Sequence, residues 1–365
     1  MTVTNVEPAP SLQPAGWISA SRHRPTAMLF AALIAALAAA ALLSLSAGAT
    51  GVSLHILPAA LFPQTNETGT AAANAALVLF DIRLPRTLLA VFVGGALAVA
   101  GAMMQGMFRN PLADPGLIGV SSGAALAAVA VIAFGSGIAA PVTAFLGIHA
   151  LPVAAFCGGL AVTALLVGLS SDTRQLSTAG LLLAGLAVGA LAQAVMGLIA
   201  YLSDDRALRD LTLWTLGSFA GASWQKVLGV LPFALVSVLL LPRLVRGLNG
   251  LLLGEAEAFY LGIDTRKTKY AIVFVTAALV GSAVAVAGII GFVGIVVPHI
   301  VRLISGPDHA TLLPASALLG ATITLLADIA ARTVVAPAEL PVGIVMSLIG
   351  APFFLHLILK RQVHV

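Results

Sequence analysis

The sequence predicts an all-α integral membrane protein with about ten transmembrane helices and an inverted-topology internal repeat relating spans 2–5 to spans 7–10. Hydrophobic residues make up 60% of the 365-residue chain and charged residues only 9%, against about 25% in soluble domains. The mean hydropathy is +1.07, and the apolar runs are continuous and long enough to cross a bilayer. This composition excludes a soluble enzyme. The net charge of +4 is spread thinly along the chain, which excludes a nucleic-acid-binding protein.

The elements follow in order from the apolar runs. Residues 1–26 are polar and are expected to form a cytoplasmic tail. The run over 27–47 is longer than the apolar region of a signal peptide, so it is interpreted as the first span. A single transmembrane domain is expected over 27–365. The other spans are predicted near 87–107, 116–134, 150–170, 178–202, 224–246, 271–290, 293–305, 313–332 and 341–360.

The basic residues set the predicted orientation. Ten spans place both termini on one side of the membrane. With both termini in the cytoplasm, 12 of the 18 Lys and Arg residues lie on that side, as the positive-inside rule favours. The six basic residues on the outer side are Arg83, Arg86, Arg206, Arg209, Lys226 and Arg332.

Two similar segments indicate the internal repeat. Ala-Leu-Ala-Val-Ala-Gly ends the second span at 96–101, and Ala-Val-Ala-Val-Ala-Gly ends the seventh at 283–288. A stretch interrupted by Gly and Pro follows each, over 106–116 and 291–298. In the predicted topology the second span runs inward and the seventh outward, which is typical of transporters with inverted repeats. Chance similarity in a chain rich in Ala, Val and Gly is the alternative.

No pattern typical of a catalytic or metal site stands out. The seven His residues are scattered, and the single Cys157 excludes intrachain disulfides and a Cys-based metal cluster. Met103, Met104 and Met107 have helical spacing, which favours core packing over a soft-metal or haem site. We therefore expect that the chain binds no cofactor or metal of its own.

The sequence also lacks a clear motif for ATP binding or for ion coupling. Residues 262–268 resemble a phosphate-binding loop only faintly, because Arg266 stands where that motif needs its second Gly. The chain is therefore not expected to bind ATP, and no enzymatic activity is expected. Asp328 is the main carboxylate within a span, and it could pair with Arg332 four residues later. An ion-coupled carrier working alone is thus less favoured than a transporter powered by a partner.

The longest predicted cytoplasmic loop favours such a partner. Residues 251–269 are expected to form two short helices. Glu255 and Glu257 would lie in the first turn of one helix, where the helix dipole favours acidic side chains, and Gly262 is placed to end it. The second helical turn is expected over 264–270. Two short helices at a membrane face suit a groove on another protein, whereas an ordinary solvated loop is the alternative.

Several separated motifs resemble, in order, the permease subunits of type II ABC importers, the family that takes up cobalamin, ferric siderophores and haem. The resemblance covers residues 27–361. Its motifs are Arg83-Leu84-Pro85-Arg86, Gly101-Ala102-Met103-Met104-Gln105, Asn110-Pro111-Leu112-Ala113-Asp114-Pro115-Gly116, Leu182-Leu183-Ala184-Gly185, Leu261-Gly262, Gly291-Phe292-Val293-Gly294 with Pro298-His299 and Arg302, Leu326-Ala327-Asp328, and Glu339-Leu340-Pro341-Val342-Gly343.

The resemblance implies the assembly and its site residues. It implies a homodimer in the bacterial inner membrane, two separate ATPase subunits that bind ATP and Mg²⁺, and a periplasmic binding protein. Binding-protein docking is implied for Arg83, Arg86 and Arg332, with anchoring of helix ends as the alternative. Ala179 stands where relatives more often carry a polar residue. The residues implied in ATPase coupling are Gly254, Glu255, Glu257, Ala258, Leu261 and Gly262, and those implied in the cytoplasmic gate are Asn110, Leu112, Thr178 and Ala179.

The resemblance also bears on the substrate. The C-terminal block 331–341 and the general pattern are most similar to the haem-importing members. A nearly uncharged pathway rich in Ala, Leu, Met and Gly would suit the passage of a large, flat, apolar macrocycle. A ferric siderophore is a close alternative and cobalamin a more distant one.

Overall fold

The computed structural model describes residues 23–47, 74, 76–137, 139–170 and 178–362, and most of the predicted tail lies outside them. Every regular element in this part of the chain is helical. The elements are α1 (His23–Ser46), the π-helical η1 (Val78–Arg83), α4 (Leu84–Phe108), the 3₁₀ helix η2 (Pro115–Ile118), α5 (Val120–Phe134), α6 (Ala140–Leu146), the 3₁₀ helix η3 (Gly147–His149), α7 (Ala150–Ser170), α8 (Thr178–Leu202), α9 (Asp205–Thr215), α10 (Trp224–Leu253), α11 (Glu255–Tyr260), α12 (Thr265–Ala287), α13 (Val293–Ser305), α14 (His309–Thr333) and α15 (Val342–Gln362).

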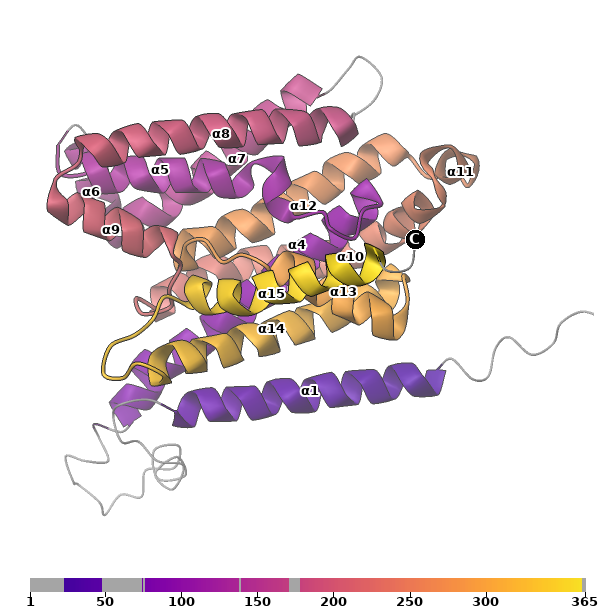
Figure 1. The fold of residues 1–365 in the computed structure, drawn as a ribbon, viewed down its shortest axis with the longest axis horizontal. Helices are drawn as coiled ribbons and strands as arrows, with labels where there is room; N and C mark the ends of the chain where they lie inside the picture. Colours follow the sequence, from indigo (N-terminus) through magenta and orange to yellow (C-terminus); the bar gives the residue numbers. More distant parts are fainter. Residues whose placement is uncertain (1–22, 48–73, 75, 138, 171–177, 363–365) are drawn as a thin grey trace, which may run out of the picture.

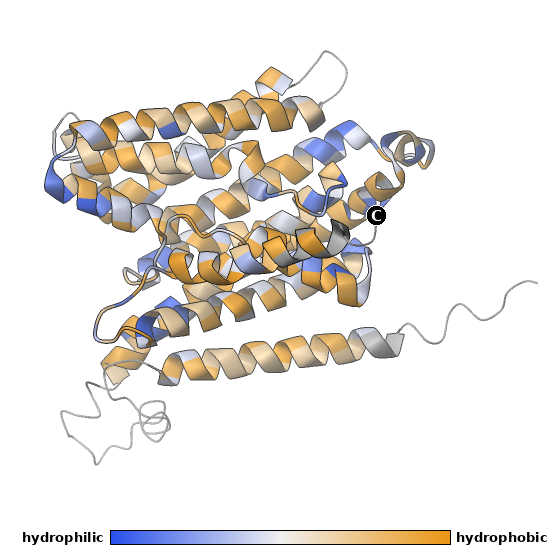
Figure 2. Ribbon diagram, viewed as in Figure 1, coloured by the Kyte–Doolittle hydropathy of each residue, from blue (hydrophilic) through white to orange (hydrophobic). Residues whose placement is uncertain are grey.

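Ten of the helical stretches are apolar, as the sequence predicts. Seven described stretches are long and apolar enough to cross a membrane, and three shorter apolar helices accompany them, namely α5, α13 and the apolar part of α15. The helices α5 and α13 are short, in agreement with the short spans predicted over 116–134 and 293–305. In Figure 2, hydrophobic residues dominate the helices and hydrophilic residues gather toward their two ends.

The long helices lie roughly side by side, with α1 along one edge and α8 along the opposite edge (Figure 1). The centre is α4, where 78% of the apolar stretch is buried, and α12, where 72% is buried. In contrast, only 17% of the corresponding stretch is buried in α1 and in α10. Met103, Met104 and Met107 lie in this core with at most 3% of their surface exposed, so their predicted packing role is confirmed.

Small residues allow the central helices to approach closely. A Cβ atom added to Gly94 in α4 would collide with the backbone of Gly320 in α14. A Cβ atom added to Gly101, two turns further along α4, would collide with the carbonyl group of Gly294 in α13. Because lipid tails are as apolar as Leu, close backbone packing of this kind is a main driving force for helix association in membranes.

The helices at the centre also have the directions that the inverted repeat requires. Arg109 follows the last residue of α4 and lies beside Gly254, just before α11. Lys269 in the first turns of α12 forms an ion pair with Glu255 of α11. The end of α4 and the beginning of α12 therefore meet the same element, and the two helices run in opposite directions. We call this end of the molecule the α11 end, and the other the arginine end.

One local prediction is wrong, and one helix was not predicted. The separate helical turn expected over 264–270 is instead the beginning of the continuous helix α12, where Asp264 accepts a hydrogen bond from the Lys267 N–H at 3.0 Å and caps the helix. The helix that was not predicted is α9, a short amphipathic helix rich in charged residues. Asp204 caps α9 by accepting a hydrogen bond from the Ala207 N–H at 2.7 Å.

Candidate functional site

The short helix α11 sits at the turn between two long helices. Gly254 joins α10 to α11 with φ at +127°, and Gly262 follows α11 with φ at +75°. Both values lie in the region that L side chains rarely adopt, so glycine is required at each turn. A Cβ atom on Gly254 would also collide with the Glu257 carboxylate. The two predicted glycines therefore fix the position of α11.

The side chains at the end of α11 point away from the rest of the chain. Phe259, Tyr260 and Leu261 are 70%, 86% and 57% exposed, whereas Ala258 on the other face is buried. The rings of Phe259 and Tyr260 at the end of α11, with the Leu261 side chain that follows, form an exposed apolar surface, which we call the α11 surface. Surfaces of this kind, with polar residues around them, are typical of protein–protein contacts.

An ion pair fixes α11 to the long helix that follows. Lys269 Nζ lies 2.7 Å from the Glu255 carboxylate, and the Lys269 side chain is only 4% exposed. The backbone N–H of Lys267, which donates to the Asp264 carboxylate, lowers the pKa of that group below its usual value. A force applied to α11 would therefore be passed directly to α12.

The predicted gate residues lie near the same end, in two segments. Asn110 and Leu112 follow α4, and the Asn110 side-chain oxygen accepts a hydrogen bond from the Leu112 N–H at 3.0 Å. Ala179 lies exposed in the first turn of α8, and Thr178 begins that helix, although its side chain lies outside the described residues. No hydrogen bond or ion pair among the described side chains joins the two segments.

Arg109 connects the gate segment to α11. This residue directly precedes Asn110 and has a left-handed backbone with φ at +50°. Its guanidinium lies 3.9 Å from the position of a Cβ atom on Gly254. Further along the segment, burial raises the pKa of Asp114, while a hydrogen bond from the Gly116 N–H acts in the opposite direction. Sequence reasoning missed Arg109, and no pattern in the sequence pointed to it.

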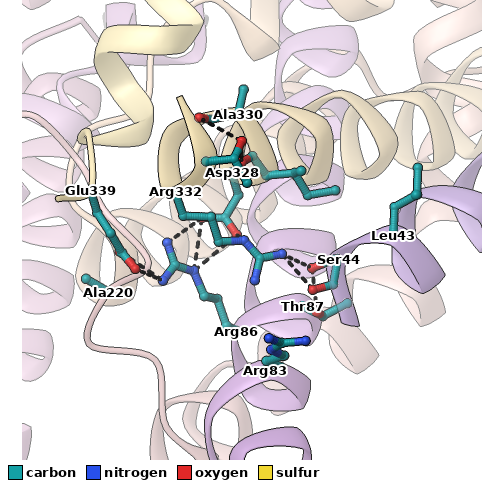
Figure 3. Close-up of polar contacts among 12 residues, drawn as sticks. Leu43, Ser44, Arg83, Arg86, Thr87, Ala220, Asp328, Ala330, Arg332 and Glu339 are labelled. Atoms are coloured by element: carbon teal, nitrogen blue, oxygen red, sulfur yellow. Dashed lines mark hydrogen bonds and ion pairs between the residues drawn. The ribbon is translucent and has the colours of Figure 1, made fainter. Parts of the chain in front are cut away.

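The three predicted docking arginines gather at the opposite end, where they are buried (Figure 3). Arg83, Arg86 and Arg332 are 3%, 7% and 7% exposed. The Arg86 guanidinium binds Asp328 with Nη2 to oxygen at 2.9 Å, and Glu339 at 3.0 Å. Asp328 is fully buried, and its carboxylate lies 3.6 Å from Arg332 Nε. We call these residues the arginine cluster.

The cluster also connects α1 to the centre of the molecule. Arg332 donates to the Ser44 carbonyl oxygen at 2.7 Å and to its hydroxyl at 2.9 Å. Arg83 donates to the carbonyl oxygens of Leu45 and Ser46. The arginine cluster therefore holds the ends of α1, α4 and α14 together, which is the anchoring alternative considered from the sequence. The pairing of Asp328 with Arg332 was anticipated, whereas the larger share taken by Arg86 was not.

The described residues contain no group of three or more His, Cys, Asp or Glu side chains that could hold a metal ion. The candidate site has two distinct parts. One is the exposed α11 surface beside the segment that carries Asn110 and Leu112, and the other is the buried arginine cluster at the opposite end. A bundle of apolar helices of this length is typical of a multi-pass membrane protein.

Comparisons with known proteins give the same class. The sequence model described as the FecCD transport family matches residues 32–360. The hemin transport system permease protein HmuU of Yersinia pestis is 47% identical over 285 residues, covering 78% of this chain and 84% of that protein. The vitamin B12 import system permease protein BtuC of Escherichia coli O6:K15:H31 is 44% identical over 322 residues, covering 88% and 91%. The fold is also similar to a solved structure, described as an inward-facing conformation of an ABC transporter assigned to the metal-chelate type. The two superpose with a TM-score of 0.78 at 35% identity, over 92% of this chain and 99% of that one.

These matches define a transmembrane permease subunit of an ABC importer. The chain belongs to the FecCD transport family. Membership decides against an ion-coupled carrier working alone.

Proposed function

We propose that the chain is the permease of a haem importer in the bacterial inner membrane. Two copies would form the pathway between them, two separate ATPase subunits would bind ATP and Mg²⁺, and a periplasmic protein would deliver haem. The permease domain would occupy 27–365, with the α11 end and both termini in the cytoplasm. The identity of 47% to a hemin permease and the sequence of the 331–341 block support haem. The 44% identity to a vitamin B12 permease keeps cobalamin as an alternative beside ferric siderophores.

The α11 surface is the observation that supports a permease driven by separate ATPase subunits. Phe259 and Tyr260 are largely exposed at a turn between two long apolar helices, and the chain itself does not cover them. An ATPase subunit with an apolar groove would bury these rings. The coupling residues proposed from the sequence lie within or beside this surface: Gly254, Glu255, Glu257, Ala258, Leu261 and Gly262.

The contacts support a sequence of movements. When ATP closes the partner subunits, they would displace α11. The Lys269–Glu255 ion pair would pass this displacement to α12. Arg109, whose guanidinium lies near Gly254, would pass it to the segment that carries Asn110 and Leu112. Hinge motions of this kind need only a few residues at the ends of elements to change their backbone angles.

Uptake into vesicles tests the substrate. The full assembly is reconstituted with its cognate binding protein and is given haem, a ferric siderophore or cobalamin with ATP. We expect ATP-dependent accumulation of haem only. Accumulation of cobalamin or of the siderophore in its place would contradict the haem assignment, while accumulation by the permease alone would contradict the need for a separate motor.

Replacement of Tyr260 by Ala is expected to uncouple or weaken the ATPase contact. Loss of a buried aromatic anchor at an interface costs about 2 kcal/mol or more, which corresponds to at least about thirtyfold in affinity. The measurement is co-purification of the ATPase subunit, together with ATP hydrolysis by the assembly. Phe145→Ala is the matched control, because Phe145 is 88% exposed on α6 near the other end. Unchanged ATPase binding by Tyr260→Ala would contradict the role of the α11 surface.

Charge reversal of Arg83, Arg86 and Arg332 together is expected to abolish binding-protein docking, as the resemblance implies. Because these side chains are buried and paired within the chain, the folded state must be tested in the same samples. Asp328→Asn disturbs the same cluster but keeps all three arginines. If Asp328→Asn reduces docking as strongly as the triple variant, the arginines act by shaping this end of the molecule, and the prediction of direct docking is wrong.

A further inference from the structure

A cavity opens at the arginine end, away from the α11 surface. Its volume is about 620 Å³, and it is lined by the first turns of α7 and α10 and the last turns of α12. Ligand-binding pockets have volumes of about 300–1,000 Å³, so the cavity is large enough for an organic ligand.

The wall of the cavity is divided by polarity. Phe156 of α7 and Phe233 of α10 form its apolar part, with ring centroids 4.6 Å apart. Toward the beginning of α10 the lining becomes polar, with Ser223, Gln225 and Lys226. A molecule that fills this cavity would therefore have an apolar body and a polar head.

Lys226 gives the polar part a positive charge. Among the described residues, no carboxylate lies within ion-pairing distance of its ammonium group. Glu339 lines a neighbouring cavity of about 470 Å³ that also includes Lys226, but its carboxylate is held by Arg86 at 3.0 Å. An ammonium group that is partly withdrawn from water favours an anionic partner, and a phosphate group offers several strong acceptors.

The surroundings of the cavity favour a lipid as that partner. The cavity lies at the beginning of a membrane helix, and its lining residues Ser223 and Gln225 stand on either side of Trp224 in the chain. Trp is a residue type enriched at membrane–water interfaces. Val153 of α7, which lines the cavity, is 41% exposed, and Leu228 and Leu231 on the opposite face of α10 are 62% and 46% exposed. The cavity therefore lies beside a membrane helix with apolar side chains at the surface of the molecule, where lipid acyl chains can reach it.

From this arrangement we propose that the cavity binds a membrane lipid with an anionic phosphate headgroup. Lys226 contacts the phosphate, with Ser223 and Gln225 beside it as hydrogen-bonding groups. An acyl chain lies against Phe156 and Phe233. The site is separate from the α11 surface and does not depend on the identity of the transported substrate.

Native mass spectrometry of the full chain in detergent tests the site. Phosphatidylglycerol, phosphatidylcholine with the same acyl chains, and inorganic phosphate are added in separate titrations. We expect the chain to retain phosphatidylglycerol in preference to phosphatidylcholine, and phosphate alone to bind too weakly to detect. Lys226→Gln is expected to weaken phosphatidylglycerol binding about fivefold, as for loss of one lysine near an anionic lipid surface, and to leave phosphatidylcholine binding unchanged.

A second variant blocks the cavity without removing the charge. Gly229 lines the cavity and has no neighbouring atom within 4 Å of an added Cβ. Gly229→Leu should therefore fold normally and abolish retention of phosphatidylglycerol. Gly168→Leu is the matched control, because Gly168 on α7 is equally open and lies toward the far end of that helix.

Four results would overturn the proposal. They are equal retention of both lipids by the unaltered chain, unchanged phosphatidylglycerol binding in Lys226→Gln, full occupancy by phosphate alone, and displacement of the lipid by haem. The last result would assign the cavity to the transported substrate instead.

Discussion

Asp328→Asn is expected to lower the free energy of unfolding by about 3–5 kcal/mol, as observed when one partner of a buried ion pair is removed. The Asp328 carboxylate is fully buried and accepts hydrogen bonds from Arg86 Nε at 3.1 Å and Nη2 at 2.9 Å. It also lies 3.6 Å from Arg332 Nε. A neutral amide of the same shape would leave the buried Arg86 and Arg332 guanidinium groups without this carboxylate, and only Arg86 would keep an ion pair, with the partly exposed Glu339.

The measurement is the thermal midpoint of the purified chain in detergent, which should fall by on the order of 10 °C. Asp264→Asn is the matched control. Asp264 also forms an ion pair, with Lys267 at 3.1 Å, but both side chains are exposed, and exposed pairs contribute little. A midpoint for Asp328→Asn equal to that of the control would show that the arginine cluster does not stabilise the fold.

Gly101→Ala is the second substitution with a large expected effect. The added methyl group would collide with the Gly294 carbonyl group, which belongs to the backbone of α13 and cannot rotate away. The helices α4 and α13 must therefore separate, and overpacking of this kind costs about 1–3 kcal/mol or more. Because Gln105, one turn later, donates to the carbonyl oxygens of Gly294 and Ile295, the separation would also break these hydrogen bonds.

We expect a lower yield of folded protein and a thermal midpoint several degrees below that of the unaltered chain. Gly197→Ala in α8 is the control, since nothing lies within 4 Å of its added Cβ and Ala favours a helix over Gly by about 1 kcal/mol. If Gly101→Ala and Gly197→Ala had the same stability, the close approach of α4 and α13 would not be essential to the fold.

The sequence predicted the helices well because hydropathy and length act locally. The spans over 150–170, 178–202 and 293–305 have the bounds that the structure shows. Prediction was weaker where polarity did not separate helix from loop. Residues 205–215 form α9 despite their charges, and 265–270 continue into α12 because the Asp264 cap starts the helix before its apolar part begins.

The candidate site residues were also predicted in part. The glycines on either side of α11 could be recognised, because a turn between two helical segments commonly needs Gly. The arginines could be placed at one end of the molecule from the topology. Their burial could not be predicted, because the partners of Arg86 lie 242 and 253 residues away along the chain. Lys226 was likewise placed on the outer side without any sign of the cavity beside it.

The sequence by itself determined that this chain is a bundle of about ten apolar helices with two similar halves, since the bilayer requires continuous apolar runs and internally bonded backbone. Its motifs also determined the family. Only the tertiary structure decided which charged side chains face one another and which face water or lipid. Burial and pairing depend on how distant helices pack, and that packing follows from the close contact of small residues such as Gly94 and Gly101 with neighbours that no local pattern specifies.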